Sequence, residues 1–280
     1  MTSEPTYWDG RTVVVTGATK GIGRATATLF ARRGAHVVVH GRDEAQGNEL
    51  VSTLRSGGAS ASLVLADLRE EAAPLAVISS ALRETGRLDL LVNNAGANVF
   101  KGTMDATIDD WNDCINLDLR AVWLASQAAA AVMEPGSAIV NVSSNHAGST
   151  LHGVFPYNVA KAGVNALGQS LAIELASRGI RVNTVAPGYI DTPINDNYFA
   201  TFADAEQARR HAEALHPLGR LGAADEVAYA IEFLGDGSRS GFTTGTVLTL
   251  DGGRSALLQD PQSAGQDTAA GTTTGSATAE

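Results

Sequence analysis

The stretch Thr16–Gly23, which reads T-G-A-T-K-G-I-G, decides how the rest of this 280-residue chain is interpreted. It follows an apolar run, Thr12–Val15, typical of a buried strand, and it leads into Ile22–Arg33, where apolar residues have helical spacing. Glycines allow a backbone to pass close to a pyrophosphate, and the start of a helix offers free N–H groups to such an anion. Three glycines lie at this turn: Gly17, Gly21 and Gly23. Their spacing alone also fits a tight turn without a ligand. Whether a nucleotide binds at this turn must therefore be judged from the residues further along the chain.

The composition favours a soluble globular protein. Hydrophobic residues make up 44% of the chain, and the formal net charge of −10 argues against a broad nucleic-acid-binding surface. The single cysteine, Cys114, excludes an intrachain disulfide, and the six histidines lack metal-binding spacing, so no metal site is predicted. The first eight residues do not resemble a secretion signal, and no apolar stretch is long enough for a bilayer. We therefore expect a cytoplasmic protein with no membrane partner.

Short apolar runs alternate with longer helical segments along the chain. The predicted strands are Thr12–Val15, Val37–Val39, Ser62–Leu65, Leu88–Val92, Ala138–Val142, Val182–Val185 and Thr246–Leu250. The predicted helices between them include Glu44–Arg55, Glu70–Glu84, Ile108–Met133, Tyr157–Ala176 and Asp225–Leu234. This alternation predicts the α/β class: one doubly wound, Rossmann-type domain over residues 10–254, with a seven-stranded parallel sheet and helices on both faces. Ligands of such sheets bind at the C-terminal ends of the strands.

Two segments depart from this alternation. Residues 189–217 form a long insertion after the sixth strand, with aromatic residues and a helical patch, which favours a lid over a ligand more than an ordinary packed helix pair. Residues 255–280 are rich in Gly, Thr, Ala and Gln and nearly lack apolar side chains, so a disordered tail is predicted.

The residues that point to chemistry lie in the middle of the chain. Tyr157 and Lys161 are one helical turn apart, so that the ammonium group favours the phenolate and lowers the pKa of the phenol. Alone, this pair also fits an ordinary surface pair. Ser144 ends a predicted strand, where its hydroxyl can orient a carbonyl toward Tyr157, whereas Ser143 should face the other way. Asn116 is a polar residue within an apolar helix, and it also fits a structural role.

These motifs occur in the order and spacing of the short-chain dehydrogenase/reductase family. N-N-A-G at Asn93–Gly96, P-G at Pro187–Gly188, P-L-G-R-L-G at Pro217–Gly222 and T-G-T-V-L-T-L-D-G-G at Thr244–Gly253 belong to the same pattern. The chain resembles the 3-oxoacyl-carrier-protein-reductase-like members from about Gly10 to Gly253. The resemblance implies a catalytic set of Asn116, Ser144, Tyr157 and Lys161. In the family the Asn supports a water-linked proton path, the Tyr protonates the developing alkoxide, and the Lys also binds the nicotinamide ribose.

The resemblance and the glycine turn together predict the residues that contact a dinucleotide. They are Gly17, Thr19, Lys20, Gly21, Ile22, Gly23, Arg42, Asp67, Leu68, Asn94, Ala95, Gly96, Tyr157, Lys161, Pro187, Gly188, Ile190 and Thr192. Within the family, Asp67 matches a position that contacts adenine, and Thr192 one on the carboxamide side of the nicotinamide. Asp67 also fits a helix N-cap.

The end of the second strand bears on which coenzyme binds. An acidic residue that accepts from the adenosine ribose would be expected near Gly41 in a protein that prefers NAD, and here Gly41 is followed by Arg42. Arg42 and Lys20 can converge on a 2′-phosphate, so NADP(H) is the preferred coenzyme and NAD(H) the alternative. The carboxylate of Asp43 would favour NAD(H), because it would repel a 2′-phosphate. It is, however, placed to cap the next helix.

The substrate is less well specified. Residues that we expect near it are Asn145, His146, His152, Phe155, Tyr189 and the segment 194–202. We expect a small carbonyl or alcohol. A carrier-protein-bound acyl group is the alternative. Carrier proteins are acidic, so their docking surface should be basic, but Glu134 and Pro135 stand where such reductases often carry a Lys or Arg. Arg178 is then the cation that remains to dock a carrier protein. A non-catalytic NADP(H)-binding sensor or scaffold is a further alternative. A nucleotide-sugar epimerase or dehydratase would need a larger C-terminal domain.

Helices 108–133 and 157–176 carry many small apolar residues. In members of the family these helices pack against their copies in a second subunit, so a homodimer or homotetramer is predicted. Burial within one subunit is the alternative.

Overall fold

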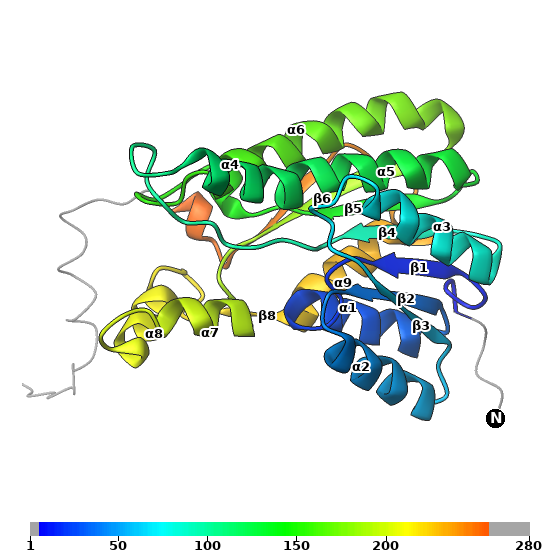
Figure 1. Ribbon diagram of the computed structural model, residues 1–280, viewed down its shortest axis with the longest axis horizontal. Helices are drawn as coiled ribbons and strands as arrows, with labels where there is room; N and C mark the ends of the chain where they lie inside the picture. Colours follow the sequence, from blue (N-terminus) through cyan, green and yellow to red (C-terminus); the bar gives the residue numbers. More distant parts are fainter. Residues whose placement is uncertain (1–5, 258–280) are drawn as a thin grey trace, which may run out of the picture.

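Seven parallel strands form one sheet with helices on both faces (Figure 1). The computed structural model describes residues 6–257. The strands are β1 (Thr12–Val15), β2 (His36–Gly41), β3 (Ala61–Leu65), β4 (Leu90–Asn93), β5 (Ala138–Val142), β6 (Arg181–Pro187) and β9 (Val247–Leu250). They lie in the order β3-β2-β1-β4-β5-β6-β9, which reverses direction between β1 and β4, where a doubly wound sheet opens a crevice. The predicted fold class and its seven strands are confirmed.

Each face of the sheet is covered by its own helical layer. Helices α1 (Gly21–Arg32), α2 (Glu44–Ser56) and α9 (Ala224–Gly235) form one core cluster with it, and α3 (Ala73–Thr85), α5 (Ala121–Val132) and α6 (Tyr157–Leu175) form the other. The strands are runs of Val, Ile and Leu because both of their faces are buried, as in β1, where every residue is buried. Helix α2 is capped as predicted, with Asp43 accepting a hydrogen bond of 3.0 Å from the backbone N–H of Gln46.

The segment predicted as one helix over 108–133 contains a π-helical turn. Helix α4 (Ile108–Ile115) runs through η1 (Asn116–Arg120) into α5, and the backbone N–H of Ala121 bonds to the carbonyl of Asn116, five residues back. Such turns insert an extra residue into a helix and often occur at functional sites. The turn lies under the carboxyl edge of the sheet, beside the start of α6.

The segment 189–217 forms structure that the sequence pattern did not predict in detail. Strands β7 (Ile190–Asp191) and β8 (Gly222–Ala223) form a separate two-stranded sheet, and α7 (Pro193–Phe199) and α8 (Ala205–Ala214) project beyond the main sheet (Figure 1). Phe199, Ala212 and Leu221 make a small core of their own there. The two helices thus pack together as a unit, and their action as a lid stays a prediction.

Four short helices complete the described chain: η2 (Asn145–Ala147), η3 (Ala176–Arg178), α10 (Gly237–Ser240) and η4 (Arg254–Ala256). The predicted disordered tail, 255–280, falls almost wholly on residues 258–280, outside the described residues. Within residues 6–257, no helix combines the length and the apolar character needed to cross a bilayer.

Candidate active site

A cavity of about 540 Å³ opens at the carboxyl edge of the sheet. It runs from the end of β2, past the ends of β1, β4 and β5, to the loops after β6 and β9. Of the eighteen predicted dinucleotide contacts, all line this cavity except Gly23 and Asp67. Gly23 instead lets α1 approach the turn, because a Cβ there would collide with the carbonyl oxygen of Gly17.

The glycine turn and the turn after β4 are bonded into one unit. The hydroxyl of Thr16 accepts from the backbone N–H of Asn94 at 2.9 Å and of Ala95 at 3.0 Å, and the Asn94 amide donates to the Thr16 and Gly17 carbonyls. Gly17 has φ of +63°, and a Cβ on it would lie 2.8 Å from the Ala95 Cα atom. Helix α1 starts beside this unit without a side-chain cap, so its first N–H groups stay available to an anion. This cradle fits a dinucleotide pyrophosphate.

His40, at the end of β2, supports the same turn and is not predicted by the sequence analysis. Its Nδ1 accepts from the backbone N–H of Gly17 at 3.2 Å, and its Nε2 lies 3.1 Å from the carbonyl of Ala66. These partners require a neutral ring protonated at Nε2. Burial lowers the pKa of His40 to about 4, which keeps that form at neutral pH.

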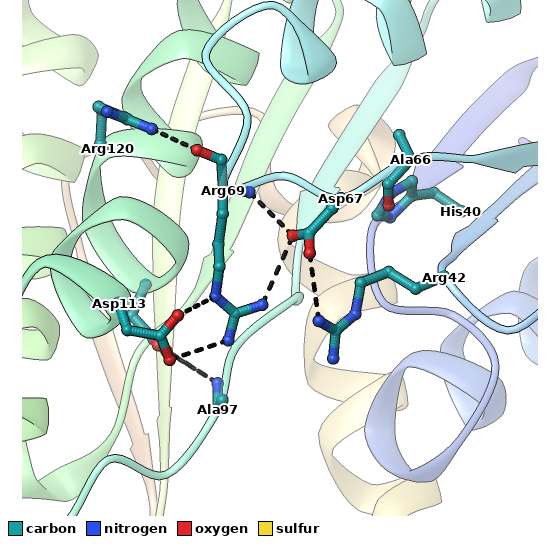
Figure 2. Close-up of polar contacts among 9 residues, drawn as sticks. His40, Arg42, Ala66, Asp67, Arg69, Ala97, Asp113 and Arg120 are labelled. Carbon is teal, nitrogen blue, oxygen red and sulfur yellow. Dashed lines mark hydrogen bonds and ion pairs between the residues drawn. The ribbon is translucent and has the colours of Figure 1, made fainter. Parts of the chain in front are cut away.

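The far end of the cavity carries the two predicted phosphate-binding cations. Arg42 and Lys20 both line it, and the Arg42 side chain is 60% exposed. Figure 2 shows Arg42 paired with Asp67 at 3.3 Å, while Asp67 also accepts from the backbone N–H of Arg69 at 3.0 Å. Burial would raise the pKa of Asp67, but these hydrogen bonds hold it below its usual value. Asp67 therefore anchors Arg42 at the cavity rim.

Tyr157, Lys161 and Ser144 meet at the middle of the cavity, as the sequence predicted. The Lys161 ammonium lies 5.5 Å from the centre of the Tyr157 ring and donates to the carbonyl of Val142 at 3.2 Å. Ser144 follows β5, lines the same cavity as Tyr157, and its hydroxyl acts to lower the pKa of the Tyr157 phenol. Ser143 faces the other way, and its hydroxyl donates to the backbone carbonyl of Lys161 at 3.0 Å, fixing α6 to β5.

The fourth position of this group is occupied by Asp118, not by Asn116. Asp118 has no exposed surface, lies 3.1 Å from the Lys161 Nζ atom and accepts from the backbone N–H of Ala97. Asn116 does not line the cavity. The helical stripe that faces inward runs through Cys114, Leu117 and Asp118, and Asn116 falls beside it. The position that we predicted for Asn116 is therefore corrected to Asp118.

Burial and charge set the protonation of this group. Burial raises the pKa of Tyr157, Lys161 acts against that rise, and Asp118 adds to it. The expected lowering by Lys161 is thus present but outweighed, and Tyr157 holds its proton at neutral pH. Burial by itself lowers the pKa of Lys161, but the Asp118 carboxylate more than reverses this, so the ammonium stays charged.

The substrate end of the cavity is aromatic. The Phe100 ring lies 5.4 Å from that of Tyr157 and 5.8 Å from that of Tyr198, and Tyr189 and His146 lie beside them. Of the predicted substrate contacts, those lining the cavity are Asn145, His146, Tyr189, Ile194, Asn195 and Asn197. His152 is exposed and Phe155 packs on Trp111, so neither lines it. Phe100, Asn98 and Arg254 line it without having been predicted, because each lies outside the motifs.

Comparison with known proteins agrees with this architecture. A family model described as Enoyl-(Acyl carrier protein) reductase matches residues 17–255. The 3beta-hydroxysteroid dehydrogenase 1 of Eggerthella lenta is 38% identical over 249 residues, covering 87% of this chain and 93% of that protein. The cis-4-hydroxycyclohexanecarboxylate dehydrogenase of Sinomonas cyclohexanicum is 40% identical, covering 88% and 97%.

A solved short-chain dehydrogenase/reductase of Serratia marcescens superposes with a TM-score of 0.82 at 30% identity, covering 88% of this chain and 98% of that one. The fold, the glycine cradle and these relatives together make the protein an oxidoreductase that acts on alcohol or carbonyl groups with a nicotinamide coenzyme, NAD(P)(H). The chain belongs to the short-chain dehydrogenase/reductase family.

Proposed function

We propose that this enzyme is an NADP(H)-dependent oxidoreductase for the carbonyl or secondary alcohol group of a small molecule, with Tyr157 as its general acid and base. The observation that carries this is the meeting of Ser144, Tyr157 and Lys161 in the same cavity as the glycine cradle. When bound, the nicotinamide supplies or accepts the hydride. The protein supplies the proton and holds the substrate oxygen.

Each side chain has a part that follows from its position. The Ser144 hydroxyl, which acts to lower the pKa of the Tyr157 phenol, holds the substrate oxygen beside that phenol. Tyr157, protonated because it is buried, gives its proton to that oxygen as negative charge develops there. Lys161 then stabilises the phenolate, and Asp118 keeps Lys161 charged and in place. In the oxidation direction the same groups act in reverse.

The relatives suggest a cyclic secondary alcohol. Their names give a hydroxysteroid and a hydroxycyclohexanecarboxylate, whose hydroxyl groups are on saturated rings. The aromatic rings of Phe100 and Tyr189, which line the cavity, give the substrate end a surface that suits such a ring. A carrier-protein-bound substrate is less well supported, because Arg178, the cation expected to dock it, donates to the backbone carbonyls of Ala130 and Met133.

Replacing Tyr157 by Phe tests the proposal. Loss of the proton donor should lower the rate of ketone reduction by about 10²–10⁴-fold. Binding of NADPH, followed by its fluorescence, should change little, because the phenol contributes only one of many contacts. Tyr229→Phe, at a residue with half of its surface exposed, is the control and should retain full activity. A Tyr157→Phe enzyme that keeps most of its turnover would contradict the assigned role.

Coenzyme preference is tested at Arg42. If Arg42 binds the 2′-phosphate, Arg42→Gln should raise the KM for NADPH about 10- to 100-fold, which corresponds to about 1.5–3 kcal/mol for a hydrogen bond to a charged group. The KM for NADH should change much less. Arg24→Gln is the matched control, because Arg24 pairs with Glu49 outside the cavity. A wild-type enzyme with the lower KM for NADH would refute the preference.

A further inference from the structure

Two polar atoms at the substrate end of the cavity have no hydrogen-bond partner. They are Nη1 of Arg254, from η4 after β9, and Nδ1 of His146, from η2 after β5. Both atoms are fully buried, and neither has a partner among residues 6–257. Buried polar atoms in folded proteins are nearly always bonded, so an unpaired donor in a substrate cavity indicates that the substrate supplies the acceptor.

Arg254 also gives the substrate end of the cavity a positive charge that no carboxylate side chain of the described residues neutralises in an ion pair. The other cations that line it are Lys161, which is matched by Asp118, and Lys20 and Arg42, which lie at the opposite end. No carboxylate within residues 6–257 forms an ion pair with Arg254. Its guanidinium lies 5.0 Å from the centre of the Tyr189 ring, a cation–π contact that holds the group in place.

His146 is neutral and can add a second donor. Burial, and then the charge of Arg254, lower the pKa of His146 to about 4. A neutral ring carries one proton, and in the Nδ1–H tautomer that proton is offered at the unpartnered atom. A guanidinium N–H and an imidazole N–H together match the two oxygens of a carboxylate.

We propose that Arg254 and His146 form a carboxylate-binding subsite, so that the substrate is an oxo or hydroxy acid with an apolar body. This inference rests on the proposed function, since it names the substrate class of the same cavity. The apolar body lies against the Phe100 and Tyr189 rings, which line the cavity. The enzyme recognises the substrate carboxylate through its negative charge.

The strand order separates the carboxylate from the reacting carbon. Ser144 follows β5 and Arg254 follows β9, which lies two strands away and hence roughly 10 Å distant at the usual spacing of parallel strands. Arg254 and His146 both line the cavity, and the charge of Arg254 contributes to lowering the pKa of His146. The carboxylate therefore lies several bonds from the carbonyl, and a 4-oxo acid is a better probe than a 2-oxo acid.

Paired substrates test the subsite. The ratio of kcat/KM for 4-oxocyclohexanecarboxylate to that for 4-methylcyclohexanone should be high in the wild-type enzyme. Arg254→Met should lower this ratio about 10- to 100-fold, the loss expected for a charged hydrogen bond. Arg254→Lys should restore part of it. Arg239→Met, at an exposed arginine outside the cavity, is the matched control and should keep the wild-type ratio.

A binding measurement separates this inference from the proposed hydride transfer. Cyclohexanecarboxylate, which has no carbonyl to reduce, should raise the thermal unfolding midpoint of the wild-type enzyme with NADP⁺, and cyclohexanol at equal concentration should not. Arg254→Met should lose this response. Turnover of both ketones at the same ratio in wild type and Arg254→Met overturns the subsite alone. Stabilisation by the acid without turnover of either ketone supports the subsite and overturns the hydride transfer.

Discussion

Asp118 gives the buried ammonium group of Lys161 a full negative partner. Both side chains lie out of solvent, where the attraction of opposite charges is stronger but each charge loses its hydration. A Cβ on Gly96 would lie 2.5 Å from the Asp118 carboxylate, so the turn after β4 also depends on this position. Compared with an amide at the same place, the carboxylate weakens the effect of Lys161 on Tyr157.

Asp118→Asn should therefore move the pH dependence of the enzyme. Because Asp118 raises the pKa of Tyr157, its removal should let the phenol lose its proton at lower pH. The pH profile for alcohol oxidation should shift toward acid by about one pH unit, or about 1.4 kcal/mol. Asp113→Asn is the control, because Asp113 pairs with Arg69 at the surface of the same helix. An unshifted profile in a folded Asp118→Asn enzyme would show that the carboxylate does not act on Tyr157.

The sequence could not choose between Asn116 and Asp118 by residue type. Asn116 is the residue that the family motif suggests, and charged residues are rarely fully buried. Periodicity carries the missing information, since Cys114, Leu117 and Ala121 mark the inward stripe and Asp118 lies within it. The pair becomes evident only when α6 places Lys161 against that stripe. Tyr157, Lys161 and Ser144 were predictable because their spacing is short or tied to a strand end.

His40 joins three elements of the coenzyme site. It belongs to β2, accepts from the glycine turn that starts α1, and donates to the carbonyl of Ala66 after β3. Only a neutral ring can make both hydrogen bonds, because Nδ1 must be unprotonated to accept from the Gly17 N–H. Protonation would place a second N–H against the Gly17 N–H and break the link between strand and turn.

This junction should make the fold sensitive to mild acid. The pKa of His40 is about 4 when folded and about 6.5 when unfolded, so the unfolded state takes up more protons between these values. Its contribution is complete above pH 6.5 and falls as the pH drops toward 4, by about 2 kcal/mol at pH 5. Urea unfolding of the wild type at pH 7.5 and 5.0 should show this loss together with that of His36 and His146, whose pKa values burial also lowers.

His40→Asn isolates the contribution, because its side-chain oxygen can still accept from the Gly17 N–H but does not titrate. This variant should be less stable than the wild type at pH 7.5, since the bond to Ala66 is lost, yet should lose about 2 kcal/mol less on going to pH 5.0. His152→Gln, at an exposed histidine, is the control and should keep the wild-type difference. An equal pH response in His40→Asn and wild type would exclude His40 as the acid-sensitive group.

Elements differed in how far the sequence predicted them. The Val-rich strands were placed within two residues or so at most ends, because strands buried on both faces read as apolar runs. The predicted helix 70–84 begins only at Ala73, where Pro74 fits the first turn. The two-residue strands β7 and β8 were missed because so short a pair has no periodicity. The π-helical turn has no sequence signature that we could read.

The residues proposed to bind coenzyme and substrate lie along one edge of the sheet, each after the end of a different strand. Arg42 lies after β2, the glycine cradle after β1 and β4, Ser144 after β5, and Arg254 after β9. Contacts that follow neighbouring strands are therefore separated along this edge by the distance between two strands, about 4.8 Å. If Arg42 and Arg254 act as proposed, coenzyme choice and substrate charge are set by different loops at opposite ends of the cavity, and each can change without altering the proposed proton-transfer group between them.

The outer surface of helices α5 and α6, which faces away from the sheet, exposes large apolar side chains to solvent. Trp123 of α5 is 47% exposed and Ile173 of α6 is 79% exposed, and these helices lie side by side on the same face of the sheet (Figure 1). Burial of large apolar side chains against a partner is favourable by about 1.5–3 kcal/mol each. The predicted pairing of helices 108–133 and 157–176 with a second copy would cover both residues.

We expect sedimentation of the wild-type protein to give a mass of two or four times 28.9 kDa. Trp123→Glu combined with Ile173→Glu should lower that mass, because two carboxylates would be buried against their own copies without partners. Leu75→Glu, at an exposed leucine of α3, is the control and should keep the wild-type mass. A wild-type protein that sediments at 28.9 kDa over a wide concentration range would mean that these side chains stay in solvent. An unchanged mass for the double variant would place the contact on another surface.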